Sequence, residues 1–225
     1  FDMINMFKFG YEPECCQWIH RSGDPIPVLA VAEKGTNNVR VYDGKGGGSE
    51  PLRTLDRIHM KPVVLMAYNP VYDVMISSDE SGMIEYWSGP SGDYQCPPST
   101  KIVRFESKLE TDLFDFVKNK AVPLSMSVSP TGKHFVVFSN DKKIRVFRFQ
   151  TGKLTVVIDE SLQHYAELQQ VNQIFPSMEF NKKVSTEKEV EKMGVLKSSN
   201  VVFDQSGHFI IYPSLVGIKV VNLYT

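Results

Sequence analysis

A pattern of short β-rich runs separated by polar corners repeats along this chain of 225 residues. Four pairs of runs follow it: 27–32 with 39–43, 73–77 with 83–87, 134–138 with 143–147, and 209–212 with 217–221. An internal repeat of short strands with turn residues between them is typical of the blades of a β-propeller. The repeat therefore predicts an all-β fold, a propeller fragment of about four blades.

The copies are spaced more widely than the roughly 40–45 residues of a bare WD-type blade, so we expect insertions between them. Two stripes of apolar residues at helical spacing predict helices there: Leu109, Leu113, Phe116 and Val117, then Leu162, Tyr165, Leu168, Val171 and Phe175. Asp159 or Ser161 is expected to cap the second helix, and Pro176 to end it. A third, highly charged helix is expected over residues 180–193, with Phe180, Val184 and Val190 on its apolar side.

These signals divide the whole chain, 1–225, into parts of one WD-type propeller with helical insertions. The parts are 1–9, the last strand of a preceding blade; 15–57 and 58–108, two blades; 109–119, a helical insertion; 120–158, a third blade; 159–194, a second helical insertion; and 195–225, an incomplete blade. Because both end segments cut through a blade, we expect the chain to be a fragment of a longer protein.

Composition restricts the possible partners only weakly. The chain has 25 basic and 26 acidic side chains and a formal net charge of −1, so its charge gives no general attraction to nucleic acid or anionic membranes. No apolar run approaches the roughly 18 residues that span a bilayer. The odd, sparse set of Cys15, Cys16 and Cys96 fits free thiols in a reducing compartment.

Several segments together are specific enough to indicate relatives: 81–87, 111–114, 151–154 with 159–162, and 217–222. They resemble the WD-repeat region of a nuclear cyclophilin-type family, the peptidylprolyl isomerase domain and WD repeat-containing proteins, and the resemblance extends over nearly the whole chain. It implies further WD repeats before Phe1 and a cyclophilin domain after Thr225, so the cyclophilin domain is not in this chain. It also implies a nuclear location, association with spliceosomes and, in plant members, contact with histone tails.

The chain has no recognisable catalytic constellation of its own. None of its five histidines forms a metal-binding or catalytic pair, and no GxSxG elbow occurs. The glycine-rich run at residues 44–49 lacks the phosphate-loop pattern and is better explained as a hairpin. We therefore expect no catalytic, metal-binding or cofactor-binding residue and no cofactor. By the resemblance, the parent protein is a peptidyl-prolyl cis–trans isomerase through the cyclophilin domain that this chain lacks.

His59 is the histidine with the clearest expected role. It precedes the strand at residues 63–68, where WD blades often place a histidine that hydrogen-bonds toward the next corner and a tryptophan, here Trp87. The aspartate expected six residues before Trp87 is Ser81, with Asp79 two residues earlier. We therefore expect a structural His59 and an incomplete polar network in every blade.

Two basic clusters are the candidate partner-binding residues: Lys142, Lys143 and Arg145, and Lys182 with Lys183. Strand alternation places Arg145 opposite the apolar Ile144 and Val146, which predicts that it faces solvent. A patch of this kind would meet phosphate or an acidic protein, and the alternative is a merely solvated face.

The sequence thus predicts a protein-interaction scaffold of a spliceosome-associated nuclear peptidyl-prolyl isomerase that acts in pre-mRNA splicing. Its expected partners are spliceosomal proteins and RNA of the assembly, with no membrane and no small-molecule substrate. An alternative is a WD-repeat module that binds histone tails in chromatin. A third possibility, an enzyme with a site in the central channel, is opposed by the missing acid–base and metal sets.

Overall fold

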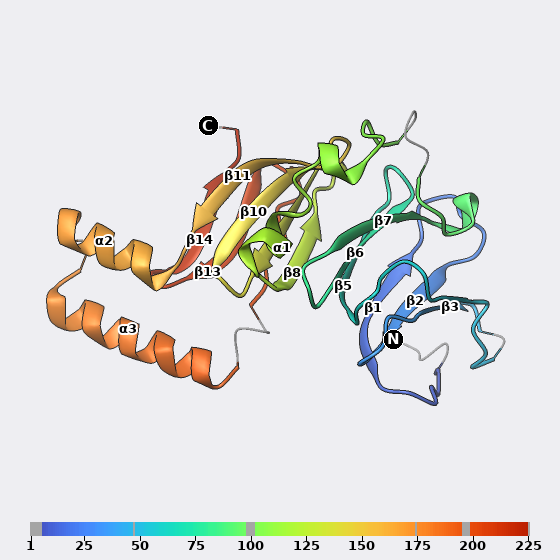
Figure 1. Ribbon diagram of the computed structural model, residues 1–225, viewed down its shortest axis with the longest axis horizontal. Helices are drawn as coiled ribbons and strands as arrows, with labels where there is room; N and C mark the ends of the chain where they lie inside the picture. Colours follow the sequence, from blue (N-terminus) through green and yellow to red (C-terminus); the bar gives the residue numbers. More distant parts are fainter. Residues whose placement is uncertain (1–5, 47, 98–101, 174, 195–198, 225) are drawn as a thin grey trace. The chain divides into compact units, whose positions relative to one another are not determined.

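Antiparallel sheets make up most of the computed structural model, which describes residues 6–46, 48–97, 102–173, 175–194 and 199–224 (Figure 1). Neighbouring strands follow chain order in each of its four sheets. The chain forms two compact units, Phe1–Pro123 with Phe149–Gly152 and Leu124–Arg148 with Lys153–Thr225.

The first unit contains two sheets and three short helices. Its strands are β1 (Pro13–Ile19), β2 (Val28–Glu33), β3 (Val39–Asp43) and β4 (Arg53–Leu55) in one sheet, and β5 (Val63–Asn69), β6 (Val74–Asp79) and β7 (Ile84–Ser88) in the other. Its helices are η1 (Pro90–Gly92), η2 (Lys108–Glu110) and α1 (Asp115–Asn119).

One hydrophobic core joins the two sheets of the first unit. Its buried members come from both sheets: Ile19, Val28, Ala30, Ala32, Val39, Val41, Val63, Met66, Met75 and Trp87. Every residue of β6 is buried, as expected for a central strand covered on both faces. Gly82, in the β6–β7 corner, has φ +86°, and a Cβ there would lie 2.7 Å from both the Ala121 carbonyl oxygen and the Phe116 Cβ. The corner therefore needs glycine, both for its backbone and for the close approach of α1.

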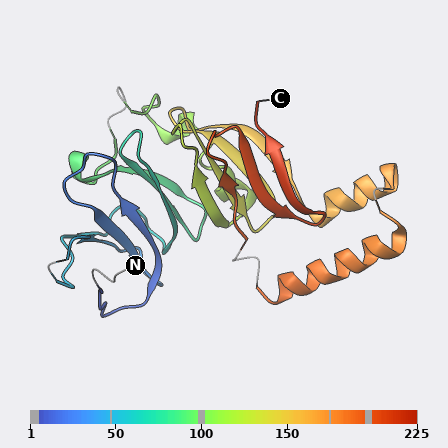
Figure 2. The same ribbon diagram turned by 180° about the vertical axis from the view of Figure 1, so that it is seen from behind.

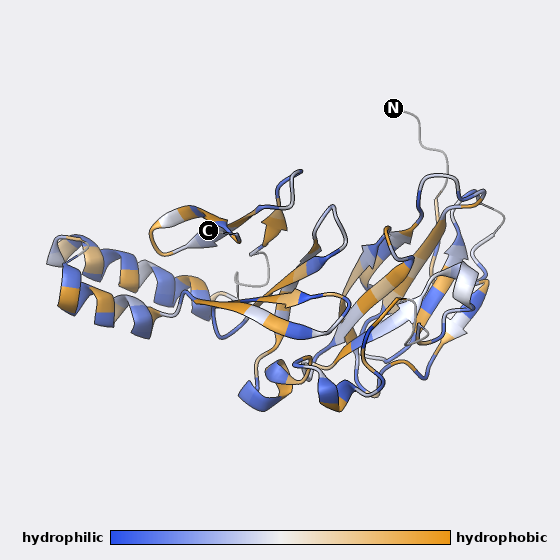
Figure 3. Cartoon of the chain, turned by 90° about the horizontal axis from the view of Figure 1, so that it is seen from above, coloured by the Kyte–Doolittle hydropathy of each residue, from blue (hydrophilic) through white to orange (hydrophobic). Residues whose placement is uncertain are grey.

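The second unit also contains two antiparallel sheets, and it adds a hairpin of two helices. Its strands are β8 (Pro123–Val128), β9 (His134–Ser139), β10 (Lys143–Arg148) and β11 (Lys153–Asp159) in one sheet, and β12 (Val202–Phe203), β13 (Phe209–Ser214) and β14 (Gly217–Asn222) in the other. Helices α2 (Leu162–Asn172) and α3 (Ser177–Lys192) follow β11 and lie side by side (Figure 1, Figure 2). Polar and apolar residues are interspersed along this hairpin (Figure 3).

The two sheets of the second unit also share a core, but one face of the β12–β14 sheet remains open. The core contains Val136, Phe138, Ile144, Val146, Val201, Ile210 and Tyr212. The side chains that alternate with Ile210 and Tyr212 belong to the opposite face, where Ile218 is 80 %, Val220 61 % and Val202 45 % exposed. Val202 and Val220 each pair with Ile211, so they form an apolar row across three strands.

This open apolar face predicts that the isolated chain is prone to aggregation. Exposed apolar patches and free edge strands both favour association. Replacing Ile218 and Val220 by lysine should shift the chain toward monomer at high concentration, as measured by light scattering after size-exclusion chromatography. Val157→Lys with Val171→Lys adds the same charge at other exposed apolar sites and should change association much less. A monodisperse wild-type monomer with one sharp melting transition would contradict the prediction.

The predicted class is confirmed at the level of a mostly β-sheet chain with few helices, whereas no closed propeller or barrel is seen among the described residues. One sheet lies within each of the ranges 15–57, 58–108, 120–158 and 195–225, apart from the first two residues of β1 and the last residue of β11. Their assignment as blades stays a prediction.

Two predicted elements, one at the start and one in the middle of the chain, differ from the described structure. No strand covers residues 6–9, and residues 1–5 lie outside the described part. Phe7 and Phe9 pack their rings against Tyr42 instead of pairing by backbone hydrogen bonds. The expected helix through Leu109 is split into η2 and α1, and Leu109 is exposed. The hydroxyl of Thr111 accepts a hydrogen bond from the Leu113 N–H, a local bond that competes with a continuous helix.

The long hairpin differs from its prediction mainly at the helix ends. Ser161 caps α2 by accepting a hydrogen bond from the His164 N–H, as predicted. The helix ends at Gln173, in left-handed conformation, before Pro176 is reached. Pro176 is instead the N-cap residue of α3, which starts three residues earlier than expected.

Candidate functional site

A buried polar network joins the loop before β5 to the strands β6 and β7. His59 Nε2 lies 2.7 Å from Ser77 Oγ, and His59 Nδ1 lies 3.2 Å from Asp79 Oδ2. Trp87 Nε1 donates to the same Ser77 oxygen at 3.0 Å. Because the indole can only donate, the Ser77 hydroxyl accepts from Trp87 and can donate to His59, which leaves the Nδ1 proton for Asp79.

This network confirms the structural role of His59 and corrects the expectation that no blade has a complete network. Ser77, which sequence reasoning missed, is the link between His59 and Trp87. Asp79 also accepts from the N–H groups of Ser81 and Met83, which closes the β6–β7 corner. Burial alone would raise the pKa of Asp79, but hydrogen bonds from His59, the Ser81 hydroxyl and the Met83 N–H outweigh burial and lower that pKa.

Arg145 is buried, so the prediction that it faces solvent is wrong. Its side chain on β10 is 2 % exposed. One guanidinium nitrogen donates to Ser139 Oγ at 2.6 Å, and the other lies 2.7 Å from Asp141 Oδ2. Alternation failed here because β10 is a central strand covered on both faces, and a charged residue on a covered face must be paired. Burial would raise the pKa of Asp141, but the hydrogen bonds from Arg145 and Ser139 lower it.

A third buried network holds the start of α2 to the β12–β14 sheet. The Glu160 carboxylate accepts from the hydroxyls of Tyr165 at 2.5 Å and Tyr212 at 2.9 Å, and from Lys219 Nζ at 2.8 Å. Tyr165 lies five residues from Glu160, but Tyr212 and Lys219 are 52 and 59 residues away, and no local motif marks them. Burial, followed by the hydrogen bond to Glu160, raises the pKa of Tyr165.

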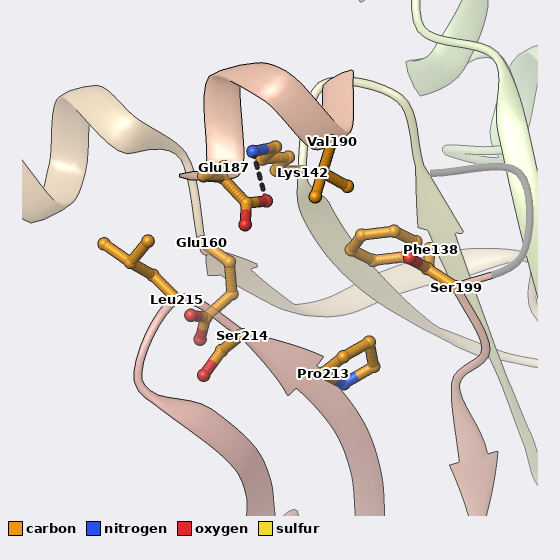
Figure 4. Close-up of a pocket in the computed structure, with 9 residues that line it drawn as sticks. All are labelled: Phe138, Lys142, Glu160, Glu187, Val190, Ser199, Pro213, Ser214 and Leu215. Carbon is orange, nitrogen blue, oxygen red and sulfur yellow. Dashed lines mark hydrogen bonds and ion pairs between the residues drawn. The ribbon is translucent and has the colours of Figure 1, made fainter. Parts of the chain in front are cut away.

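A pocket of the second unit lies beneath α3. It has a volume of about 170 Å³ and is lined by nine residues from both sheets and from the hairpin: Phe138, Lys142, Glu160, Glu187, Val190, Ser199, Pro213, Ser214 and Leu215 (Figure 4). Glu187 and Val190 point from α3 into the pocket, and Lys142 meets Glu187 at its rim (Figure 4). Lys142 Nζ lies 2.7 Å from both Glu187 Oε1 and Glu191 Oε1.

The structure does not unite the five predicted partner-binding residues into one basic patch. Arg145 and Lys142 are buried and paired with carboxylates, as described above. Lys143 is partly exposed and lies 3.1 Å from Asp159 Oδ2. Lys182 is exposed on α3, and Lys183 Nζ lies 5.2 Å from the ring centroid of Phe175. Of these five, only Lys143, Lys182 and Lys183 remain accessible to a partner.

The described residues offer binding surfaces and no evident reaction centre. No group of three or more metal-ligating side chains occurs among them. The three cysteines are free thiols, and burial raises the pKa of Cys15 to about 12, which disfavours the reactive thiolate. No helix in the described part of the chain is long and apolar enough to cross a membrane.

Comparison with known proteins shows that this chain is similar to one segment of several longer proteins. No family model matches it. Over its whole length, the chain is 47 % identical to a segment that makes up 34 % of peptidylprolyl isomerase domain and WD repeat-containing protein 1 of Mus musculus. It is 40 % identical to a segment that makes up 35 % of peptidyl-prolyl cis-trans isomerase CYP71 of Arabidopsis thaliana. An alignment that covers 99 % of the chain gives 29 % identity to a segment that makes up 37 % of peptidyl-prolyl cis-trans isomerase 9 of Schizosaccharomyces pombe. The chain therefore spans about a third of the length of proteins named as peptidyl-prolyl isomerases, some of which are also named for WD repeats.

Proposed function

We propose that this chain is part of a WD-repeat propeller that serves as a protein-interaction scaffold in a nuclear, spliceosome-associated peptidyl-prolyl isomerase. The supporting observation is the architecture: four separate antiparallel sheets, each in chain order, packed in two face-to-face pairs. A propeller is built from sheets of this kind. The network of His59, Ser77 and Trp87 adds to this, because it ties the loop before a sheet to its second and third strands.

The names of the relatives raise a second candidate, that this chain itself carries the isomerase. We expect the isolated chain to have no isomerase activity, because its buried polar networks are engaged in packing and the described residues form no closed barrel. A coupled peptide assay would check this, with a known cyclophilin as the positive control. Turnover above the buffer rate would show that this chain carries the isomerase site and would contradict the scaffold proposal.

The scaffold proposal assigns partner contacts to α3, whose outer side is exposed. Replacing Lys182 and Lys183 by glutamate in the full-length protein should weaken its association with splicing factors in pull-down. Thermal stability should change little, because exposed substitutions usually alter the free energy of unfolding by about 0.5 kcal/mol. The loss of the contact between Lys183 and Phe175 adds about 0.5–1 kcal/mol at most.

Lys61→Glu with Lys118→Glu is the matched control, since both lysines are exposed and lie in the other unit. It should leave the pull-down unchanged. Equal recovery of splicing factors by both double variants would show that α3 is not the contact. Recovery of histone peptides in place of splicing factors would favour the alternative role in chromatin.

A further inference from the structure

Lys142 occupies a backbone position that glycine fills in the corresponding corner of the first unit. Its φ is +58°, and its N–H bonds to the Ser139 carbonyl as the Gly82 N–H bonds to that of Asp79. A non-glycine residue in this left-handed conformation costs of the order of 1 kcal/mol or more, and such strain clusters at ligand clamps and switches. The side chain is also 7 % exposed although it carries a charge. A strained, buried lysine suggests a role beyond closing a corner.

The groups that face Lys142 come from one helix. Glu187 and Glu191 are one helical turn apart on α3, and each places a carboxylate oxygen 2.7 Å from Lys142 Nζ. Between them, Val190 enters the apolar part of the pocket beside Phe138 (Figure 4). Glu160, the other acidic residue of the pocket, is held by Tyr165, Tyr212 and Lys219.

Helix α3 itself is held only lightly. None of its 16 residues is buried, so little apolar area stabilises its position. The two ion pairs with Lys142 are therefore a main attachment, and Glu191 is partly open to solvent, where salt screens such pairs. A segment that is held in this way can be displaced by a competitor with the same chemistry.

We infer that the surface around Lys142 is a docking site for an acidic amphipathic helix of a partner protein, and that α3 occupies this site in cis. The partner helix would carry two carboxylates one turn apart, with an apolar residue between them to enter the pocket. Charge complementarity selects this occupant, because the unpaired group at the site after α3 leaves is the Lys142 ammonium. The inference rests on the proposed scaffold role and names the class of partner for one of its surfaces.

The test uses the full chain and a fluorescein-labelled peptide of residues 177–192, followed by fluorescence anisotropy. Glu187→Gln with Glu191→Gln in the chain removes the internal carboxylates and releases α3. This variant should bind the peptide at least about tenfold more tightly than the wild-type chain, because the wild-type site is already occupied. A peptide that carries the same two glutamines should not bind. Adding Lys142→Asn to the released chain should abolish binding, and asparagine tolerates the left-handed backbone.

Glu179→Gln with Glu189→Gln is the matched control, since it changes the charge of α3 equally at exposed positions that no ion pair with Lys142 involves. It should bind the peptide no better than wild type. Equal binding by the released chain and wild type, or undiminished binding with Lys142→Asn, would overturn the inference. A thermal melt of each variant identifies any that has lost its fold, and Lys142→Arg, which keeps the charge, should then retain binding. If full-length protein still recovers splicing factors when peptide binding fails, the scaffold proposal stands and only this docking site falls.

Discussion

Replacing Trp87 by alanine should lower the free energy of unfolding by about 3–5 kcal/mol, the range for removing a buried aromatic side chain. Trp87 is 1 % exposed and belongs to the core between the two sheets of the first unit. Its loss leaves a cavity there and takes one donor from Ser77. Urea denaturation followed by far-ultraviolet circular dichroism would measure the change, in an Ile218→Lys, Val220→Lys background if the parent chain aggregates.

The chain supplies its own control for this experiment, because Trp18 is its other tryptophan. Trp18 is 47 % exposed, so Trp18→Ala should cost clearly less. Trp87→Phe keeps most of the ring volume and loses the N–H donor, so it should fall between the two, with about 1 kcal/mol from the hydrogen bond. Equal losses for Trp87→Ala and Trp18→Ala would show that the core between these sheets is not formed.

Replacing Arg145 by alanine should cost about 3 kcal/mol, the lower end of the cost of breaking a buried ion pair. The lower end applies because the Asp141 side chain is 25 % exposed, so water can still reach it after the arginine is removed. The loss should appear in the unfolding of the second unit. Arg148→Ala on the same strand removes an exposed arginine and should change stability by about 0.5 kcal/mol or less.

Acid provides an independent check on the same pair. The pKa of Asp141 is lower in the folded chain than the ordinary value of an aspartate, so its ionised form stabilises the fold. This stabilisation is complete above the unfolded pKa and is lost as the pH falls through the folded pKa. The difference in stability between wild type and Asp141→Asn should therefore be constant near neutral pH and shrink below about pH 4. A difference that does not change with pH would mean that Asp141 gains nothing from Arg145.

Short-range patterns were enough to predict most strands of this protein. The strands β9 and β10 coincide with the predicted runs 134–138 and 143–147 to within one residue, because a β-branched and aromatic run between turn residues has few other stable solutions. Ser161 was recognisable as a cap for a similar reason, since its bond to the His164 N–H lies within one turn. The short helices near Leu109 were harder, because a brief apolar stripe does not show where local hydrogen bonds interrupt it.

The sites depended on contacts that no local pattern contains. Alternation placed Arg145 toward solvent, but only the folded chain buries that face of β10 and holds the guanidinium against Ser139 and Asp141. Lys142 looked like one member of a basic cluster, yet α3 neutralises it with carboxylates more than forty residues away in the chain.

The sequence by itself determined the strands, their order within each sheet and the helical nature of the insertions, because these follow from the periodicity and turn chemistry of neighbouring residues. Tertiary structure alone decided which polar residues are buried and with which partners. Ser77 joins His59 to Trp87, Glu160 meets Tyr212 and Lys219, and Lys142 meets α3 only when distant segments pack together. The physical reason is that burial and pairing depend on what covers each face of a sheet, which the alternation within one strand does not record.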